Sequence, residues 1–132
     1  MALEKKCILV VDDEESSRTG LSKILARSGY EVLTAGDGEE ALGKVRGAAC
    51  HLIITDMKMP KMGGIELLRE VKKLQPEIGV IMVTAYGEVD SYLEAMNLGA
   101  FEYLNKPIKV DELKKVISKV LEEQQRSIPL PE

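Results

Sequence analysis

Short runs of apolar residues alternate with amphipathic stretches along most of the chain. The first run, Cys7–Val11, is continuously apolar and stops abruptly at Asp12. A run of this kind is typical of a central parallel strand that is covered on both faces. Further apolar runs predict four more strands, at residues 31–34, 51–55, 78–83 and 101–105.

The stretches between these runs repeat their apolar residues at the spacing of an α-helix. The stripes are Leu21, Ile24 and Leu25; Gly38, Ala41, Leu42 and Val45; Leu67, Leu68, Val71 and Leu74; Val89, Leu93 and Met96; and Leu113, Val116, Ile117, Val120 and Leu121. Gly29 is expected to end the first helix, and Asp37 and Asp111 are expected to cap the second and the last. Five strands that alternate with five helices predict an α/β fold, a doubly wound parallel sheet with helices on both faces.

Polar residues follow four of the predicted strands directly. Asp12 and Asp13 follow the first strand, Asp56 the third, Thr84 the fourth and Lys106 the fifth. Any one of them is as readily a turn former as a functional residue. In open α/β sheets, however, ligands bind beyond the carboxyl ends of the strands, so these five side chains are expected to converge.

The combination of residue types indicates metal-assisted phosphoryl chemistry. Three carboxylates in one crevice repel one another unless a cation neutralises them, and hard oxygen ligands favour Mg²⁺ or Mn²⁺. A carboxylate such as Asp56 can accept a phosphoryl group as an acyl phosphate. The ammonium of Lys106 and the hydroxyl of Thr84 would stabilise the charge on the phosphoryl oxygens. The sequence has no glycine-rich nucleotide cradle, so a partner or a small molecule would supply the phosphoryl group.

Composition narrows the possible classes of protein. The chain has 132 residues, 45% hydrophobic and 30% charged, which suits one globular domain with a core that needs no disulfides. A net charge of −4 argues against an extended nucleic-acid or acidic-membrane surface. Residues 1–6 lack the apolar core of a signal peptide and no apolar run reaches membrane-spanning length, so a cytoplasmic location is expected. Cys7, Cys50 and His51 fit no metal-ligand spacing and are expected to be structural.

With these residues in place, the chain closely resembles the receiver domains of two-component response regulators. The resemblance covers residues 5–124 and rests on four motifs: Ile8-Leu9-Val10-Val11-Asp12-Asp13, Asp56-Met57-Lys58-Met59-Pro60, Val83-Thr84-Ala85 and Gly99-Ala100-Phe101-Glu102-Tyr103-Leu104-Asn105-Lys106-Pro107. It implies a flavodoxin-like receiver fold with strand order 2-1-3-4-5 over residues 1–124. Residues 125–132 would then be a flexible tail or the start of a linker.

The resemblance also implies a role for most of the strand-end residues. Asp56 would be the phosphoryl acceptor, and Asp13 would bind Mg²⁺ directly, with Asp12 supporting a metal-bound water. Asp56 itself and the backbone carbonyl of Lys58 would complete the protein ligands. Lys106 would pair with the phosphoryl oxygens, and the peptide bond that follows it would be cis, as such bonds can be before proline.

The resemblance also implies that Thr84 and Tyr103 are the residues of the family's conformational switch. Thr84 would move to hydrogen-bond the phosphoryl group, and Tyr103 would rotate inward behind it. An aromatic residue on an edge strand is more often simple packing, but its place three residues before Lys106 matches the switch position. Tyr92 has no such match and is expected to be a surface or partner contact. Lys58 and Tyr86 would flank the route of a hydrolytic water, which leaves the phosphoryl lifetime open.

Three functions fit these residues. The leading one is a receiver, not an enzyme acting on free substrates, that takes a phosphoryl group from a sensor histidine kinase or phosphotransfer protein and switches conformation to control a partner or output domain. The alternatives are a small Mg²⁺-dependent phosphatase or phosphotransferase, and a docking domain that does not need Asp56. The family also suggests a homodimer through the fourth helix, fifth strand and fifth helix. No nucleic-acid or membrane binding by this segment is expected.

Overall fold

The computed structural model describes residues 5–85 and 89–126, in which strands and helices alternate. In chain order the elements are β1 Cys7–Val11, α1 Glu15–Arg27, β2 Glu31–Ala35, α2 Gly38–Gly47, β3 Leu52–Asp56, α3 Gly64–Leu74, β4 Gly79–Thr84, α4 Val89–Asn97, β5 Glu102–Asn105 and α5 Val110–Arg126. The predicted alternation of five strands with five helices is confirmed within the described residues.

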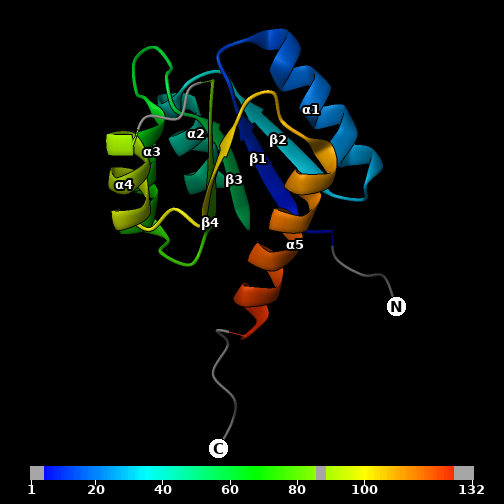
Figure 1. Ribbon diagram of the computed structural model, residues 1–132. Helices are drawn as coiled ribbons and strands as arrows, with labels where there is room; N and C mark the ends of the chain where they lie inside the picture. The colour runs from blue at the N-terminus through cyan, green and yellow to red at the C-terminus, as the bar shows by residue number, and fades with distance from the viewer. Residues whose placement is uncertain (1–4, 86–88, 127–132) are drawn as a thin grey trace, which may run out of the picture.

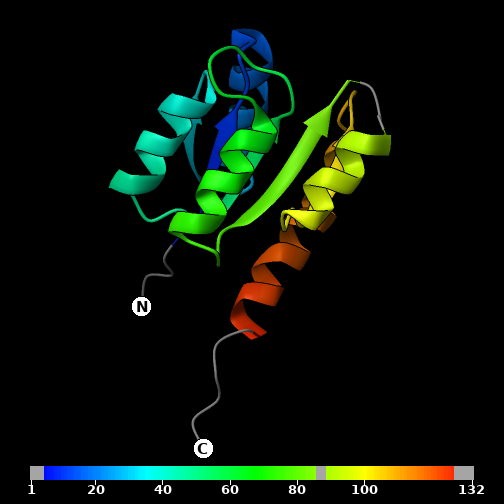
Figure 2. The same cartoon turned by 90° about the vertical axis from the view of Figure 1, so that its left-hand side faces the viewer.

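The strands form one parallel sheet in the order β2-β1-β3-β4-β5, as the resemblance implied. In this sheet Leu9 of β1 lies opposite Leu33 of β2 and Ile53 of β3. Figure 1 shows α1 and α5 on one face of the sheet and α2, α3 and α4 on the other. Figure 2 shows the second group of helices from its own side. The predicted doubly wound α/β architecture is therefore confirmed.

Two hydrophobic clusters cover the two faces of the sheet, because alternate residues of a strand point to opposite sides. In β1, Leu9 and Val11 join the cluster under α2, α3 and α4, whereas Ile8 and Val10 join the cluster under α1 and α5. All four side chains are at most 2% exposed. Burial on both sides explains why the central strands read as continuous apolar runs in the sequence.

The last helix differs from the expectation at both ends. Asp111 does not cap it, because α5 already begins at Val110 and Asp111 lies in the first helical turn. There its negative charge still suits the positive end of the helix dipole. α5 also continues to Arg126, past the predicted boundary at residue 124, and residues 127–132 of the predicted tail lie outside the described residues. No helix in the described ranges is long and apolar enough to cross a membrane.

The amino ends of the central strands are tied together around His51. Its imidazole Nδ1 accepts a hydrogen bond from the backbone N–H of Cys7 at 3.1 Å, and its own backbone N–H donates to the carbonyl of Cys7 at 3.0 Å. The side-chain amide of Gln124 in α5 donates to the carbonyl of His51 at 2.5 Å and to that of Glu77 at 3.1 Å. His51 is thus a structural residue at a strand entrance, as predicted, and it helps to attach α5 to the sheet.

A close backbone contact fixes where α3 starts. A Cβ atom on Gly64 would lie 2.4 Å from the backbone oxygen of Asp56 and 2.8 Å from Cε of Met82, too close for any side chain. The backbone N–H of Gly64 donates to the carbonyl of Met57 at 2.9 Å. Glycine therefore lets α3 begin directly against the end of β3, where Asp56 lies.

Candidate functional site

Four strand ends bring the predicted site residues to one edge of the sheet. Asp12 directly follows β1, Asp56 is the last residue of β3, Thr84 is the last residue of β4 and Lys106 directly follows β5. Because the strands are parallel, their carboxyl ends lie at the same edge. In the register of the sheet, Asp56 lies opposite Val83, the residue before Thr84. The fold therefore places together residues that are far apart in the sequence.

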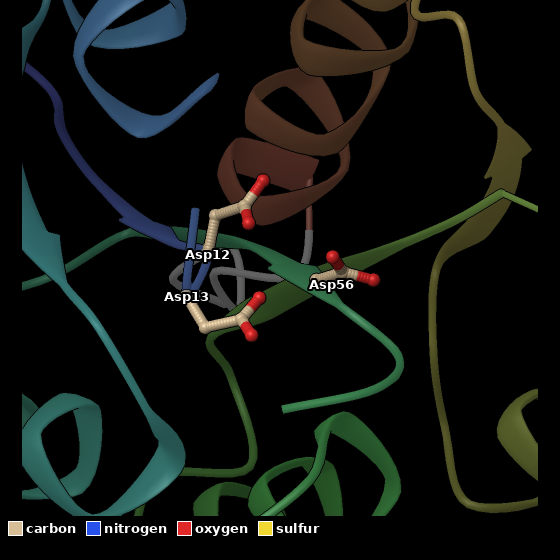
Figure 3. Close-up of side chains that lie close together, drawn as sticks. All are labelled: Asp12, Asp13 and Asp56. Carbon is tan, nitrogen blue, oxygen red and sulfur yellow. The ribbon is translucent and has the colours of Figure 1, made fainter. Parts of the chain in front are cut away.

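Three carboxyl groups gather at this edge. Asp12, Asp13 and Asp56 each offer one oxygen atom, and these oxygens lie within 4.8 Å of one another. Figure 3 shows the three side chains beside the ends of β1 and β3. Asp12 is buried, Asp56 is half-buried and Asp13 is exposed, so the group is open to solvent on one side. Carboxylates this close repel one another, and their oxygen atoms could hold a divalent metal ion.

The ammonium group of Lys106 lies against two of these carboxylates. Its Nζ is 2.9 Å from Oδ2 of Asp56 and 3.4 Å from Oδ2 of Asp12. Burial by itself would lower the pKa of Lys106, but hydrogen bonds and charge interactions with Asp56 and Asp12 outweigh it and raise the pKa above its ordinary value. Lys106 is therefore charged at neutral pH. The peptide bond between Lys106 and Pro107 is cis, as the resemblance implied.

Two contacts that the sequence did not indicate hold Asp12 in place. Nη1 of Arg18 donates to the backbone carbonyl of Asp12 at 2.7 Å, and the backbone N–H of Glu14 donates to Oδ1 of Asp12 at 2.9 Å. A basic residue on an amphipathic helix carries no functional signal by itself. The contact of Arg18 depends on how α1 lies against the end of β1, which only the tertiary structure gives.

The loop after β3 places the backbone of Lys58 beside Asp56. The N–H of Lys58 donates to Oδ1 of Asp56 over a long distance of 3.4 Å. Farther along, the carbonyl of Met62 accepts a hydrogen bond from the N–H of Gly38 at 3.2 Å. A Cβ atom on Gly38 would lie 2.6 Å from that carbonyl oxygen, so only glycine permits the contact. The start of α2 thus supports the loop that carries Lys58.

Of the two predicted switch residues, Thr84 is the last residue of β4 and Tyr103 lies on the neighbouring strand β5. Thr84 is 5% exposed, and its backbone carbonyl accepts a hydrogen bond from the N–H of Lys106 at 2.7 Å. Tyr103 packs partly buried against the cluster under α2, α3 and α4, and its hydroxyl is buried with no hydrogen-bond partner among the described residues. Its ring contacts the ring of Tyr92 in an edge-to-face arrangement. Tyr86 lies outside the described residues.

A cavity of about 540 Å³ opens beside the site. Asp12 and Lys106 line it, together with apolar side chains that include Leu21 and Ile24 of α1 and Ile108. Because two of its lining residues belong to the carboxylate site, a group bound in this cavity would lie next to Asp12 and Lys106.

Comparisons with curated proteins agree with this geometry. The family model for the response regulator receiver domain matches residues 8–118. The chain is 43% identical over 121 residues to the transcriptional regulatory protein ZraR of Klebsiella oxytoca, covering 92% of this chain and 27% of that protein. It is 39% identical over 114 residues to sporulation initiation phosphotransferase F of Bacillus subtilis (strain 168), covering 86% of this chain and 92% of that protein. The chain thus spans about a quarter of the length of the first relative and nearly all of the second.

Solved structures share the fold. The crystal structure of a CheY-like response regulator receiver domain protein from Methanospirillum hungatei JF-1 has a TM-score of 0.90 and 36% identity, covering 93% of this chain and 98% of that chain. The solution structure of the beryllofluoride-activated NtrC4 receiver domain dimer has a TM-score of 0.84 and 36% identity, covering 89% of this chain and 98% of that chain. Both likenesses extend over nearly the full length of the described sheet and helices.

Proposed function

The chain belongs to the receiver domains of two-component response regulators, and from this premise we propose that Asp56 accepts a phosphoryl group from a histidine kinase or phosphotransfer protein. The observation that carries the proposal is the surroundings of Asp56. Asp56, Asp12 and Asp13 each offer a carboxylate oxygen, and these oxygens lie within 4.8 Å of one another. The ammonium nitrogen of Lys106 lies 2.9 Å from Oδ2 of Asp56. A nucleophile with a metal-binding group and a fixed cation beside it suits phosphoryl transfer, where positioning and charge stabilisation dominate.

We propose Mg²⁺ as the metal, with Mn²⁺ as a possible substitute. Asp13, Asp56 and the backbone carbonyl of Lys58 would hold it, and Asp12 would act through a metal-bound water. The donor set supports this choice, because its side chains offer oxygen atoms and the group is open to solvent. When bound, the ion neutralises carboxylate charge and polarises a phosphoryl oxygen.

In the proposed reaction a carboxylate oxygen of Asp56 forms a bond to phosphorus while the bond between phosphorus and the donor breaks. With a phosphohistidine donor, the imidazole nitrogen leaves with the electron pair of the P–N bond. Lys106 is already 2.9 Å from Asp56 and can stabilise the charge on the phosphoryl oxygens with little movement. Hydrolysis of the acyl phosphate returns Asp56 and inorganic phosphate, so the domain acts on itself and not on a free substrate.

The phosphoryl group then shifts the domain between two conformations. It adds about −1.5 to −2 charges and strong acceptor oxygens at Asp56. The hydroxyl of Thr84 donates a hydrogen bond to a phosphoryl oxygen. Tyr103 then occupies the space behind Thr84. A complete shift of the population from 1:99 to 99:1 needs about 5.5 kcal/mol of differential stabilisation.

We propose that the face formed by α4, β5 and α5 carries the output and that two copies associate through it. Tyr92 and Leu93 of α4 supply this face with apolar side chains that are 42% and 53% exposed. The NtrC4 receiver domain, to which the chain is similar, forms a dimer when activated by beryllofluoride. An apolar, exposed face of this kind is typical of an interaction surface.

The alternative functions have less support. A phosphatase acting on free phosphomonoesters needs a carboxylic acid as proton donor and a cap that excludes water from the substrate. The described residues form the ten elements of the receiver fold and contain no inserted cap. A docking function that does not use Asp56 would not explain why three carboxylates lie close together beside Lys106.

Phosphorylation by acetyl phosphate tests the proposed function. With Mg²⁺, the wild-type chain is expected to gain the mass of one phosphoryl group in an intact-mass spectrum, and Asp56→Asn is expected to gain none. Asp37→Asn is the matched control, because it makes the same change at a helix cap outside the site and asparagine also caps helices. No gain in the wild type, or an equal gain in Asp56→Asn, would overturn the proposal. Release of many phosphates per chain from a phosphomonoester would favour the phosphatase instead.

A further inference from the structure

Tyr92 of α4 contacts the switch residue Tyr103, although nothing in the sequence indicated such a role. The ring centroids are 5.5 Å apart and the ring planes meet at 80°, which is an edge-to-face pair. Tyr92 is 42% exposed and is therefore not a core residue. The contact joins α4 to β5, two elements of the face proposed to carry the output.

Within the described part of the chain, packing and not hydrogen bonding holds the ring of Tyr103 in its place. The hydroxyl oxygen is buried and has no hydrogen-bond partner among the described residues. Burying a hydroxyl without a hydrogen bond is unfavourable, because the group loses its contact with water. The contacts that oppose this loss are those with the cluster under α2, α3 and α4 and with the ring of Tyr92. Loss of the Tyr92 ring would therefore let Tyr103 turn towards solvent.

We infer that Tyr92 is a positioning residue that keeps the hydroxyl of Tyr103 buried before Asp56 is phosphorylated. The inference rests on the proposed function, in which burial of Tyr103 accompanies phosphorylation. An edge-to-face pair of this kind shifts the equilibrium between buried and exposed Tyr103 by about two- to tenfold. The domain is then biased in advance towards its phosphorylated conformation, and a ligand that selects this conformation binds more tightly.

The first readout is the environment of Tyr103 in the unphosphorylated full chain. Fluorotyrosine is incorporated in place of tyrosine, and the ¹⁹F NMR signal of Tyr103 is assigned by its loss in Tyr103→Phe. In the wild type this signal is expected to be protected from a soluble paramagnetic agent. Tyr92→Leu removes the ring but keeps an apolar side chain, and it is expected to shift the signal and expose it to the agent. Tyr92→Phe keeps the ring and is expected to match the wild type.

The second readout is the affinity for beryllofluoride in the presence of Mg²⁺, measured by titration calorimetry. Tyr92→Leu is expected to weaken binding by about two- to tenfold, whereas Tyr92→Phe is expected to bind like the wild type. Leu93→Ala is the matched control, because Leu93 is the next residue of the same helix and is 53% exposed. An effect that acts through association of two copies would appear in this control as well.

An unchanged Tyr103 signal in Tyr92→Leu, or a change of the same size in Leu93→Ala, would overturn the inference. If Tyr92→Leu does not fold, Tyr92→Met replaces the ring with a more flexible apolar side chain and is measured in the same way. A wild-type chain that binds no beryllofluoride contradicts the proposed function instead. The fluorine signal then still decides the role of Tyr92, since it needs neither metal nor phosphoryl group.

Discussion

At the scale of single residues, the site contains an ammonium group that keeps its charge at neutral pH. The ammonium of Lys106 lies between Asp56 and Asp12, which raise its pKa. Because folding raises the pKa of this lysine, its charge interactions stabilise the folded state fully at any pH below the ordinary lysine pKa. This contribution is lost as the pH rises through the raised pKa. Lys106 is thus charged at neutral pH, where it would interact with a phosphoryl group on Asp56. Asp12 is also held by Arg18, which donates a hydrogen bond to the backbone carbonyl of Asp12.

The two cysteines behave in the opposite way, because burial favours their neutral form. Cys7 and Cys50 are free and buried, as the sequence predicted for structural thiols. Burial is the largest cause of the raised pKa of both, and it raises the pKa of Cys50 to about 11 from an ordinary 9.0. Both thiols are therefore protonated, and poor nucleophiles, at neutral pH.

The raised pKa of Cys50 predicts a loss of stability in alkali. Below pH 9 the thiol is protonated in the folded and in the unfolded chain, so its titration has no effect. Between pH 9 and about 11 the unfolded chain loses the proton first, which favours unfolding by on the order of 2 kcal/mol. Urea unfolding at pH 8 and pH 10.5 measures this loss. It is expected to be smaller in Cys50→Ala, and an equal loss in both chains would contradict the assignment to Cys50.

At the scale of elements, helices on one face of the sheet support the loops of the site. α3 begins against the backbone of Asp56 because Gly64 has no side chain. α2 holds the next loop through the hydrogen bond from Gly38 to the carbonyl of Met62. α4 is different, because it exposes Tyr92 and Leu93 and contacts Tyr103. The same group of helices thus contains both the support of the site and one element, α4, of the face proposed for its output.

The proposed output face predicts a dimer that depends on α4. Beryllofluoride with Mg²⁺ is expected to raise the molar mass of the wild-type chain from one copy to two in light scattering. Leu93→Glu places a charge on the exposed side of α4 and is expected to stay monomeric, since burying an unpaired charge is unfavourable. Leu74→Glu is the control, because Leu74 is 44% exposed but belongs to α3. Wild-type chain that stays monomeric with beryllofluoride bound would argue against the dimer.

At the scale of the whole molecule, the site is destabilised by its own charges. Two apolar clusters cover the sheet, and the carboxylates lie at its carboxyl edge, where the packing ends. Asp12, Asp13 and Asp56 repel one another, and Lys106 offsets only part of this charge. A cation that binds the folded chain alone must then raise the stability of the entire domain.

Global unfolding is therefore expected to depend on divalent metal. At about 100 times its Kd, Mg²⁺ is expected to stabilise the wild type by about 2.7 kcal/mol, and a chelator should remove this gain. Asp13→Asn relieves repulsion and is expected to be more stable than the wild type without metal, by up to about 1 kcal/mol. It should gain much less from Mg²⁺. Thermal unfolding with chelator and with Mg²⁺ measures both effects, and equal Mg²⁺ gains in the two chains would exclude Asp13 as a ligand.

The sequence by itself determined the fold class and most of the residues at the site. Apolar runs and helical spacing are local features, and they gave all five strands and five helices of the described residues. Because parallel strands end at one edge, the order of the elements was enough to bring Asp12, Asp56 and Lys106 together. The cap of the last helix was predicted wrongly, since the exact start of α5 depends on the path of the preceding loop, which the pattern around Asp111 does not fix.

Only the tertiary structure decided which side chains meet across elements. The contact of Arg18 with Asp12 and that of Tyr92 with Tyr103 join segments whose relative positions follow from helix packing on the sheet. No local pattern encodes such contacts, because Arg18 and Tyr92 look in the sequence like ordinary surface positions of a helix. The edge that carries the carboxylates therefore follows from the order of the elements along the chain. The contacts that support it, and that join β5 to α4 in the proposed output face, arise from packing.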